Sequence, residues 1–134
     1  MTAHISGAIF DLDGLLVDTE SVYDRVIQMY AQKMAGAPLP DDVFRTMRAR
    51  MFGRKPEDSA ALLHDTLGLS QEVPASHYLE WRRPILDRVF PGTDLLPGAS
   101  RLVDHLVKHN VPIAIATSSQ RRMVELKLQR HPQV

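Results

Sequence analysis

Two short apolar runs in the sequence are each followed by a polar cluster, a pattern that is typical of buried β-strands. The first run, Ile5–Phe10, ends at Asp11, and the second, Val111–Ala116, ends at Thr117. Pro112 is compatible with the second strand because it lies at the start of the run. The sequence therefore predicts two strands whose carboxyl ends carry polar side chains.

Between and after these runs, apolar residues recur every three or four positions, which is the spacing of amphipathic helices. Pro84 lies inside the fourth helical pattern and is expected to kink or split that helix near Arg83, because proline lacks an amide hydrogen. The last helix follows Thr117–Ser119, whose hydroxyls are suited to capping it. The predicted helices begin near Asp18, Asp41, Pro56, Pro74, Ala99 and Gln120, and end near Gly36, Gly53, Gly68, Phe90, Asn110 and Arg130.

The order of these elements places a helix before the second strand, which predicts a parallel sheet with a right-handed crossover. Ligands of such sheets bind outside the carboxyl ends of the strands, where both polar clusters fall. The fold class is therefore α/β, with a Rossmann-like parallel sheet in residues 1–16 and 92–134 and an inserted helical cap in residues 17–91. Two strands are too few for the sheet of an α/β domain, so this sheet is expected to be incomplete and the chain truncated.

Composition and charge mainly exclude certain partners and kinds of site. Sixteen Lys and Arg residues balance sixteen Asp and Glu residues, so no global field attracts nucleic acid or an anionic membrane. The absence of Cys excludes disulfides, thiolate metal sites and a Cys nucleophile. The sequence shows neither a secretory signal pattern nor an apolar stretch long enough to span a membrane, so a cytoplasmic location is expected. It does not indicate an oligomeric state.

Two carboxylates, Asp11 and Asp13, lie two positions apart where the first strand gives way to a turn. Hard divalent cations such as Mg²⁺ favour oxygen ligands of this kind, and a carboxylate can also accept a phosphoryl group in covalent catalysis. The alternative is a turn in which the Asp side chains hydrogen-bond their own backbone. A helix-loop-helix calcium site is excluded, because its spacing requires glycine and glutamate where this chain has Leu16 and Val22.

The segment Ile9–Glu20 resembles the first motif of the haloacid dehalogenase (HAD) superfamily of phosphohydrolases. The segment Ile113–Ser119 resembles the second motif of that family, an apolar strand that ends in Thr or Ser. The distance between the two segments matches a helical cap inserted between them. Phe90–Ala99 and His105–His109 are most similar to the pseudouridine-5'-phosphatase branch, with sugar-phosphate phosphatases and β-phosphoglucomutase as further relatives.

This resemblance implies a role for each polar residue at the strand ends. Asp11 would be the nucleophile that becomes an aspartyl phosphate, and Asp13 the general acid and base. The Asp11 carboxylate and the Asp13 carbonyl would bind Mg²⁺. The Thr117 hydroxyl and the Ser118 amide, at a helix start, would hold the phosphoryl oxygens. The alternative for Thr117–Ser119 is a plain helix cap.

Outside these motifs, two basic residues are candidates for substrate recognition. Arg54 and Lys55 lie in a loop of the expected cap, where they would contact the substrate, and the alternative is a solvated loop. His105 and His109 lie one helical turn apart without a carboxylate partner, so a surface pair is expected there and not a metal site.

The resemblance implies a Mg²⁺-dependent phosphatase that acts on a small phosphorylated metabolite, either a sugar phosphate or a nucleotide or nucleoside monophosphate. The family's third motif, a Lys, and its fourth, an acidic pair, belong further along than this sequence runs, and Lys127 is too close to the second motif to replace that Lys. The chain is therefore expected to be an inactive fragment that binds Mg²⁺ poorly. The alternatives are a β-phosphoglucomutase-like phosphomutase and a truncated product that acts only by binding.

Overall fold

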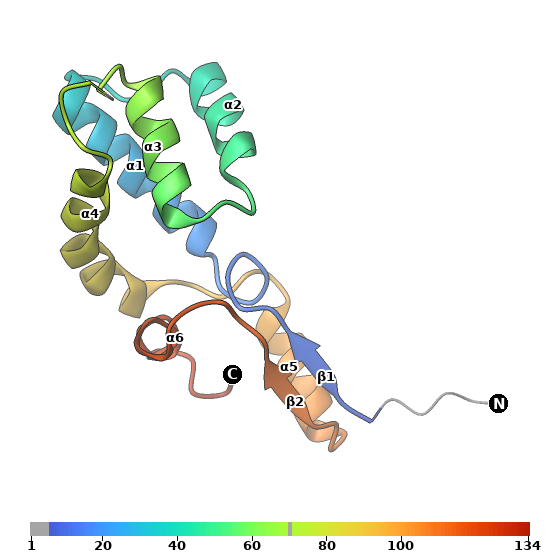
Figure 1. The fold of residues 1–134 in the computed structure, drawn as a ribbon. Coiled ribbons are helices and arrows are strands. Elements are labelled where there is room, and N and C mark those ends of the chain that lie inside the picture. Colours follow the sequence, from blue (N-terminus) through green and yellow to red (C-terminus); the bar gives the residue numbers. More distant parts are fainter. Residues whose placement is uncertain (1–5, 70) are drawn as a thin grey trace. The chain divides into compact units, whose positions relative to one another are not determined.

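The computed structural model describes residues 6–69 and 71–134, which divide into two compact units. One unit comprises Met1–Val22 and Asp87–Val134, and the other comprises Tyr23–Leu86. The elements, in chain order (Figure 1), are β1 (Ala8–Phe10), α1 (Thr19–Ala35), α2 (Asp41–Met51), α3 (Pro56–Thr66), α4 (Ser76–Val89), the 3₁₀ turn η1 (Phe90–Gly92), α5 (Ala99–Lys108), β2 (Ile113–Ile115) and α6 (Arg121–Leu128).

The two predicted strands are confirmed and pair in parallel, with Ala8 opposite Ile113 and Phe10 opposite Ile115. The Ile5 end of the first predicted strand lies outside the described residues. The pairing continues one residue beyond the strands, because the Ala116 amide donates to the Phe10 carbonyl at 2.8 Å. The loops that follow β1 and β2 therefore leave the sheet at the same edge.

Helix α5 covers one face of this small sheet (Figure 1). Side chains alternate along both strands, so that Phe10 and Ile115 face the core while Ile9 on the other face is 75% exposed. The buried residues of this core are Leu12, Leu16, Val17, Ala99 and Val103, with Phe10, Leu95, Ile113, Ile115, Val124, Leu128 and Val134 packed against them.

The loop after β1 is anchored in the core by its apolar residues. The carbonyl of Leu12, a fully buried residue, accepts hydrogen bonds from the amides of Leu16 at 3.0 Å and Val17 at 3.1 Å. Gly14 has φ 71°, a left-handed conformation that glycine adopts without a steric penalty. This compact turn buries Leu12, leaves Asp11 exposed and leaves Asp13 half-buried.

The helical unit agrees with the predicted helices, with one correction. Helix α1 ends at Ala35, and Gly36 follows it with φ 78°. Pro84 is predicted to kink or split α4 near Arg83, and the helix does not split, because it continues through Pro84 to Val89. Proline removes one backbone hydrogen bond, and the apolar side of α4, with Tyr78 and Leu86 buried, holds the helix together on both sides of it.

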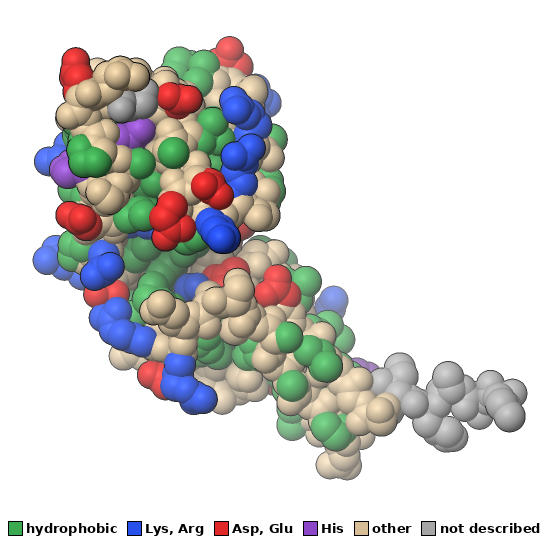
Figure 2. Space-filling model, in the orientation of Figure 1, with side chains coloured by type: hydrophobic (Ala, Val, Ile, Leu, Met, Phe, Trp, Pro, Cys, Tyr) green, Lys and Arg blue, Asp and Glu red, His purple; other side chains and the backbone are tan. Residues whose placement is uncertain are grey.

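Basic and acidic side chains are interspersed on the face shown in Figure 2. Among the helices of residues 6–69 and 71–134, none combines the length and the apolar character that crossing a membrane requires. The expected histidine pair is exposed, with His105 on α5 and His109 directly after its last residue, and the ring centroids lie 4.4 Å apart.

A buried hydrogen-bond network links three helices of the helical unit. The Tyr30 hydroxyl lies 2.9 Å from His64 Nε2 and 2.8 Å from His77 Nδ1, and His64 Nδ1 lies 3.0 Å from the Val73 carbonyl. Because a carbonyl only accepts, Nδ1 of a neutral His64 carries the proton and its Nε2 accepts from Tyr30. His77 Nδ1 must then donate to the Tyr30 oxygen, so that the Tyr30 hydroxyl both donates to His64 and accepts from His77.

We expect Tyr30→Phe to lower the free energy of unfolding by about 1–3 kcal/mol, since it leaves the buried His64 Nε2 without its donor. Urea unfolding at neutral pH, followed by circular dichroism, measures the change. Met29→Leu, at the half-exposed neighbouring position, serves as the control and should change stability by no more than about 0.5 kcal/mol. Equal stabilities of Tyr30→Phe and Met29→Leu would show that the network contributes nothing.

Candidate active site

Asp11 is the first residue beyond β1, and its side chain is exposed. Its Oδ1 accepts a hydrogen bond from the following amide, that of Leu12, at 2.8 Å. This contact fixes one carboxylate oxygen against the buried part of the loop and leaves the other directed to solvent. The sheet pairing places Asp11 beside the start of the loop that contains Thr117, because Phe10 pairs with Ile115.

The Asp13 carboxylate, the Lys127 ammonium and the Ser119 hydroxyl contact one another at the end of the sheet. Asp13 Oδ1 accepts from the Lys127 ammonium at 2.6 Å, and Asp13 Oδ2 accepts from the Ser119 hydroxyl at 2.7 Å. Lys127 also donates to Ser119 Oγ at 3.0 Å. Three segments that are distant in sequence, the loop after β1, the loop after β2 and helix α6, therefore meet at one carboxylate.

Two opposing effects act on the pKa of Asp13. Partial burial raises the pKa, because it disfavours the charged form. The hydrogen bonds from Lys127 and Ser119, together with the charge of Lys127, outweigh burial and hold the pKa below its ordinary value of 3.8. Asp13 is therefore an ionised carboxylate at neutral pH.

The loop after β2 is held by its own hydroxyls. Thr117 Oγ1 accepts from the Ser119 amide at 3.1 Å, while the Ser119 hydroxyl is directed to Asp13. The prediction that Thr117–Ser119 caps the last helix is wrong, because Gln120, in an extended conformation, occupies the cap position of α6 and no side chain caps that helix. Ser118 is exposed and precedes the helix, so its amide is part of the loop and not of the helix start.

The structure brings some of the predicted site residues together and leaves others in a separate unit. Asp11, Asp13, Thr117 and Ser118 belong to the unit that contains the sheet. Arg54 and Lys55 are exposed in the loop between α2 and α3 of the helical unit. In that unit, Arg54 borders a polar hollow that is also lined by Arg50, Asp58, His64 and Asp65.

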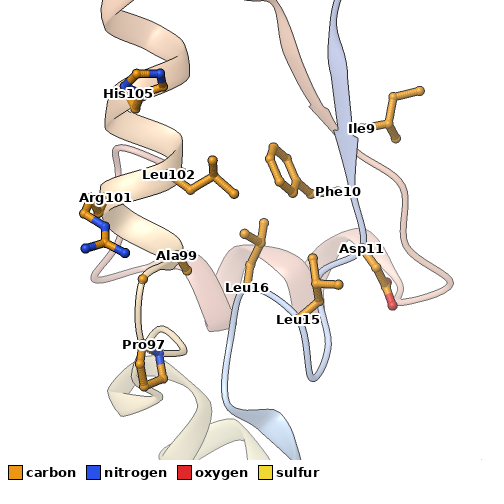
Figure 3. Close-up of a pocket in the computed structure, with 11 residues that line it drawn as sticks. Ile9, Phe10, Asp11, Leu15, Leu16, Pro97, Ala99, Arg101, Leu102 and His105 are labelled. Atoms are coloured by element: carbon orange, nitrogen blue, oxygen red, sulfur yellow. The ribbon is translucent and has the colours of Figure 1, made fainter.

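An open hollow of about 750 Å³ lies between β1 and α5, with Asp11 at its edge (Figure 3). Phe10, Leu16 and Leu102 point into it, so its lining is mainly apolar. Asp13, Thr117 and Lys127 do not line it. Of the predicted site residues in the unit that contains the sheet, Asp11 alone lines this hollow, and the others lie at the loops beyond the strands.

Sequence reasoning missed two members of the site, Ser119 and Lys127. From the sequence, Ser119 is expected in a helix cap, and Lys127 is too close to the second motif to replace the later lysine of the family. A signal for Lys127 is present, because it lies three residues after Val124 and one before Leu128, on the apolar side of α6. A lysine on the buried side of a helix requires an anionic or polar partner.

Few protein oxygen atoms at this edge are available to a magnesium ion. The described residues hold no group of three or more acidic or histidine side chains that could bind a metal. The Asp13 carboxylate is already occupied, which leaves the Asp11 carboxylate and the Asp13 carbonyl as donors. Mg²⁺ commonly uses one or two protein oxygens together with water and substrate phosphate, so this small donor set is compatible with it.

Known proteins that are similar to this chain include hydrolases and phosphatases. The family model of haloacid dehalogenase-like hydrolases matches residues 5–133. The chain is 39% identical over 127 residues to (DL)-glycerol-3-phosphatase 2 of Arabidopsis thaliana, covering 95% of this chain and 51% of that protein. It is 33% identical over 129 residues to a probable pseudouridine-5'-phosphatase of Drosophila melanogaster, covering 95% and 52%. The chain thus spans about half the length of these curated relatives.

Solved structures of similar fold include hydrolases of the same family. A HAD family hydrolase from Deinococcus radiodurans, with bound phosphate and sodium, superposes with a TM-score of 0.68 at 25% identity, covering 93% of this chain and 52% of that one. A HAD hydrolase from Entamoeba histolytica superposes with a TM-score of 0.66, also at 25% identity, covering 92% and 54%. From its motifs, its fold and the matching family model, the chain belongs to the haloacid dehalogenase-like hydrolases.

Proposed function

We propose that the chain carries the nucleophile and phosphate-binding part of a Mg²⁺-dependent phosphatase that hydrolyses a small phosphate monoester through an aspartyl-phosphate intermediate. The observation that carries this proposal is the parallel pairing of β1 with β2, which brings the Asp11–Asp13 loop and the Thr117–Ser119 loop to one edge of the sheet. The phosphatase names of the relatives support the same reaction class. Because those relatives are about twice as long, the proposal concerns a protein of their length that contains these residues.

Asp11 is the proposed nucleophile. Its carboxylate is exposed, and only one of its oxygens is used by the Leu12 amide. The other oxygen would attack phosphorus in line with the leaving alkoxide, forming an acyl phosphate and splitting the displacement into two easier steps.

Asp13 is the proposed acid and base. The Lys127 and Ser119 contacts keep its carboxylate ionised, which is the form that accepts a proton from water when the aspartyl phosphate is hydrolysed. The first step requires the protonated form, which would donate its proton to the leaving alcohol. A phosphate dianion bound nearby favours that protonation, because a second anion raises the pKa of a carboxyl group.

Thr117 and Ser118 are the proposed phosphate-binding groups. The Thr117 oxygen accepts from the Ser119 amide, so its own hydroxyl proton remains to be donated to a phosphoryl oxygen. The Ser118 amide lies in the same exposed loop and offers a second donor. A Mg²⁺ ion held by the Asp11 carboxylate and the Asp13 carbonyl would offset the repulsion between the nucleophile and the phosphate.

The helical unit is the proposed cap that selects the substrate. Arg54 and Lys55 are exposed cations in a loop between two of its helices, and long cationic side chains are suited to polar or anionic groups of a phosphorylated metabolite. Glycerol 3-phosphate and pseudouridine 5'-phosphate, which the names of the relatives suggest, are the first substrates to test. A phosphomutase would use the same residues but transfer the phosphoryl group to a sugar hydroxyl.

For the longest product of the reading frame that contains this chain, we expect Mg²⁺-dependent phosphate release from these two esters and its loss on chelation. Asp11→Asn should lower kcat by about 10³-fold or more, since it removes the nucleophile. Asp104→Asn, at an exposed carboxylate on α5, is the matched control and should retain activity. Phosphate release by Asp11→Asn at the rate of the control would exclude Asp11 as the nucleophile. Product analysis with a sugar-phosphate acceptor separates transfer from hydrolysis.

We also expect Arg54→Ala and Lys55→Ala to raise KM for the preferred ester by about tenfold with little change in kcat, because a charge-assisted hydrogen bond to the substrate is lost. Arg45→Ala removes an exposed arginine from α2 and is the matched control. Steady-state kinetics of the three variants make the comparison. KM values equal to that of the control would assign Arg54 and Lys55 to a solvated loop.

A further inference from the structure

Asp11 and Asp13 are neighbouring carboxylates that are held in different ways. One Asp11 oxygen is bonded only to the adjacent Leu12 amide, whereas both Asp13 oxygens are bonded to side chains from more than 100 residues away. Without these contacts, two carboxylates at this spacing would both be attracted to a hard cation. A carboxylate that binds the cation directly is a poor proton carrier. A phosphatase therefore needs an interaction that keeps the proton-transferring carboxylate away from the cation.

Lys127 is placed to provide this interaction. Its side chain is 2% exposed, and its ammonium group lies 4.9 Å from the centre of the Phe90 ring, in addition to its contacts with Asp13 and Ser119. The ring, the carboxylate and the hydroxyl surround the ammonium group, which limits its movement. Helix α6, which supplies Lys127, packs against η1, which supplies Phe90.

We propose that Lys127 is a positioning residue: with Ser119, it holds the Asp13 carboxylate against the loop after β2 and away from a cation bound at Asp11. The assignment rests on the proposed function, because it explains how Asp13 stays available for proton transfer. Only the Asp13 carbonyl then remains for the metal. Lys127 acts through Asp13 and is not itself a catalytic residue.

The test measures Mn²⁺ binding to the purified chain by electron paramagnetic resonance, without substrate, at a fixed neutral pH. Lys127→Met keeps the packing on Phe90 but frees the Asp13 carboxylate, so the Kd for Mn²⁺ should fall by about tenfold as one more charged ligand becomes available. In Lys127→Met with Asp13→Asn, this gain should disappear. Lys108→Met removes an exposed lysine from α5 and should leave the Kd unchanged.

A gain that persists in the double variant would mean that only the lost positive charge matters, and it would overturn the proposal. Equal Kd values for the wild type and Lys127→Met would also overturn it. Circular dichroism checks the folding of each variant. If Lys127→Met does not fold, Ser119→Ala, which removes one of the two contacts, decides: a smaller decrease in Kd supports the proposal and no decrease contradicts it.

The Kd for Mn²⁺ is measured without substrate and does not depend on turnover. Failure of the phosphatase proposal appears as activity that survives Asp11→Asn, whereas failure of the positioning proposal appears in Mn²⁺ binding alone.

Discussion

The ion pair between Lys127 and Asp13 is the interaction on which the sheet-containing unit depends. A buried ammonium group without a partner costs several kcal/mol, so α6 can pack with Lys127 inward only when the Asp13 carboxylate is in place. The pair therefore couples the packing of α6 to the conformation of the loop after β1. Through Ser119 it also fixes the loop after β2, so that the same contacts that hold the unit together arrange its polar residues.

The elements of the fold follow closely from the sequence. Helical periodicity located the helices from α1 to α6, and the apolar runs located β1 and β2, because these signals are local. Pro84 does not split α4, because the loss of one backbone hydrogen bond does not end a helix whose apolar side is packed. The cap of α6 was misplaced because Thr117 and Ser119 have other partners in the folded chain.

The candidate site was less predictable than the fold. The sequence predicts Asp11, Asp13 and Thr117 as site residues because they lie in recognisable motifs at strand ends. The contact of Asp13 with Lys127 joins residues that are 114 positions apart and depends on the packing of α6. No local pattern encodes such a pair, although a lysine on the apolar side of a short helix is a reason to look for a buried anion.

The most direct measurement is a double-mutant cycle on the free energy of unfolding with Asp13→Asn, Lys127→Met and both changes together. At pH 7 the account predicts a coupling of about 1–3 kcal/mol between the two positions. Because the pKa of Asp13 is lower in the folded chain than the ordinary 3.8, this stabilisation is present above that value and lost as the pH falls through the folded pKa. Additive effects of the two substitutions at pH 7 would contradict the account.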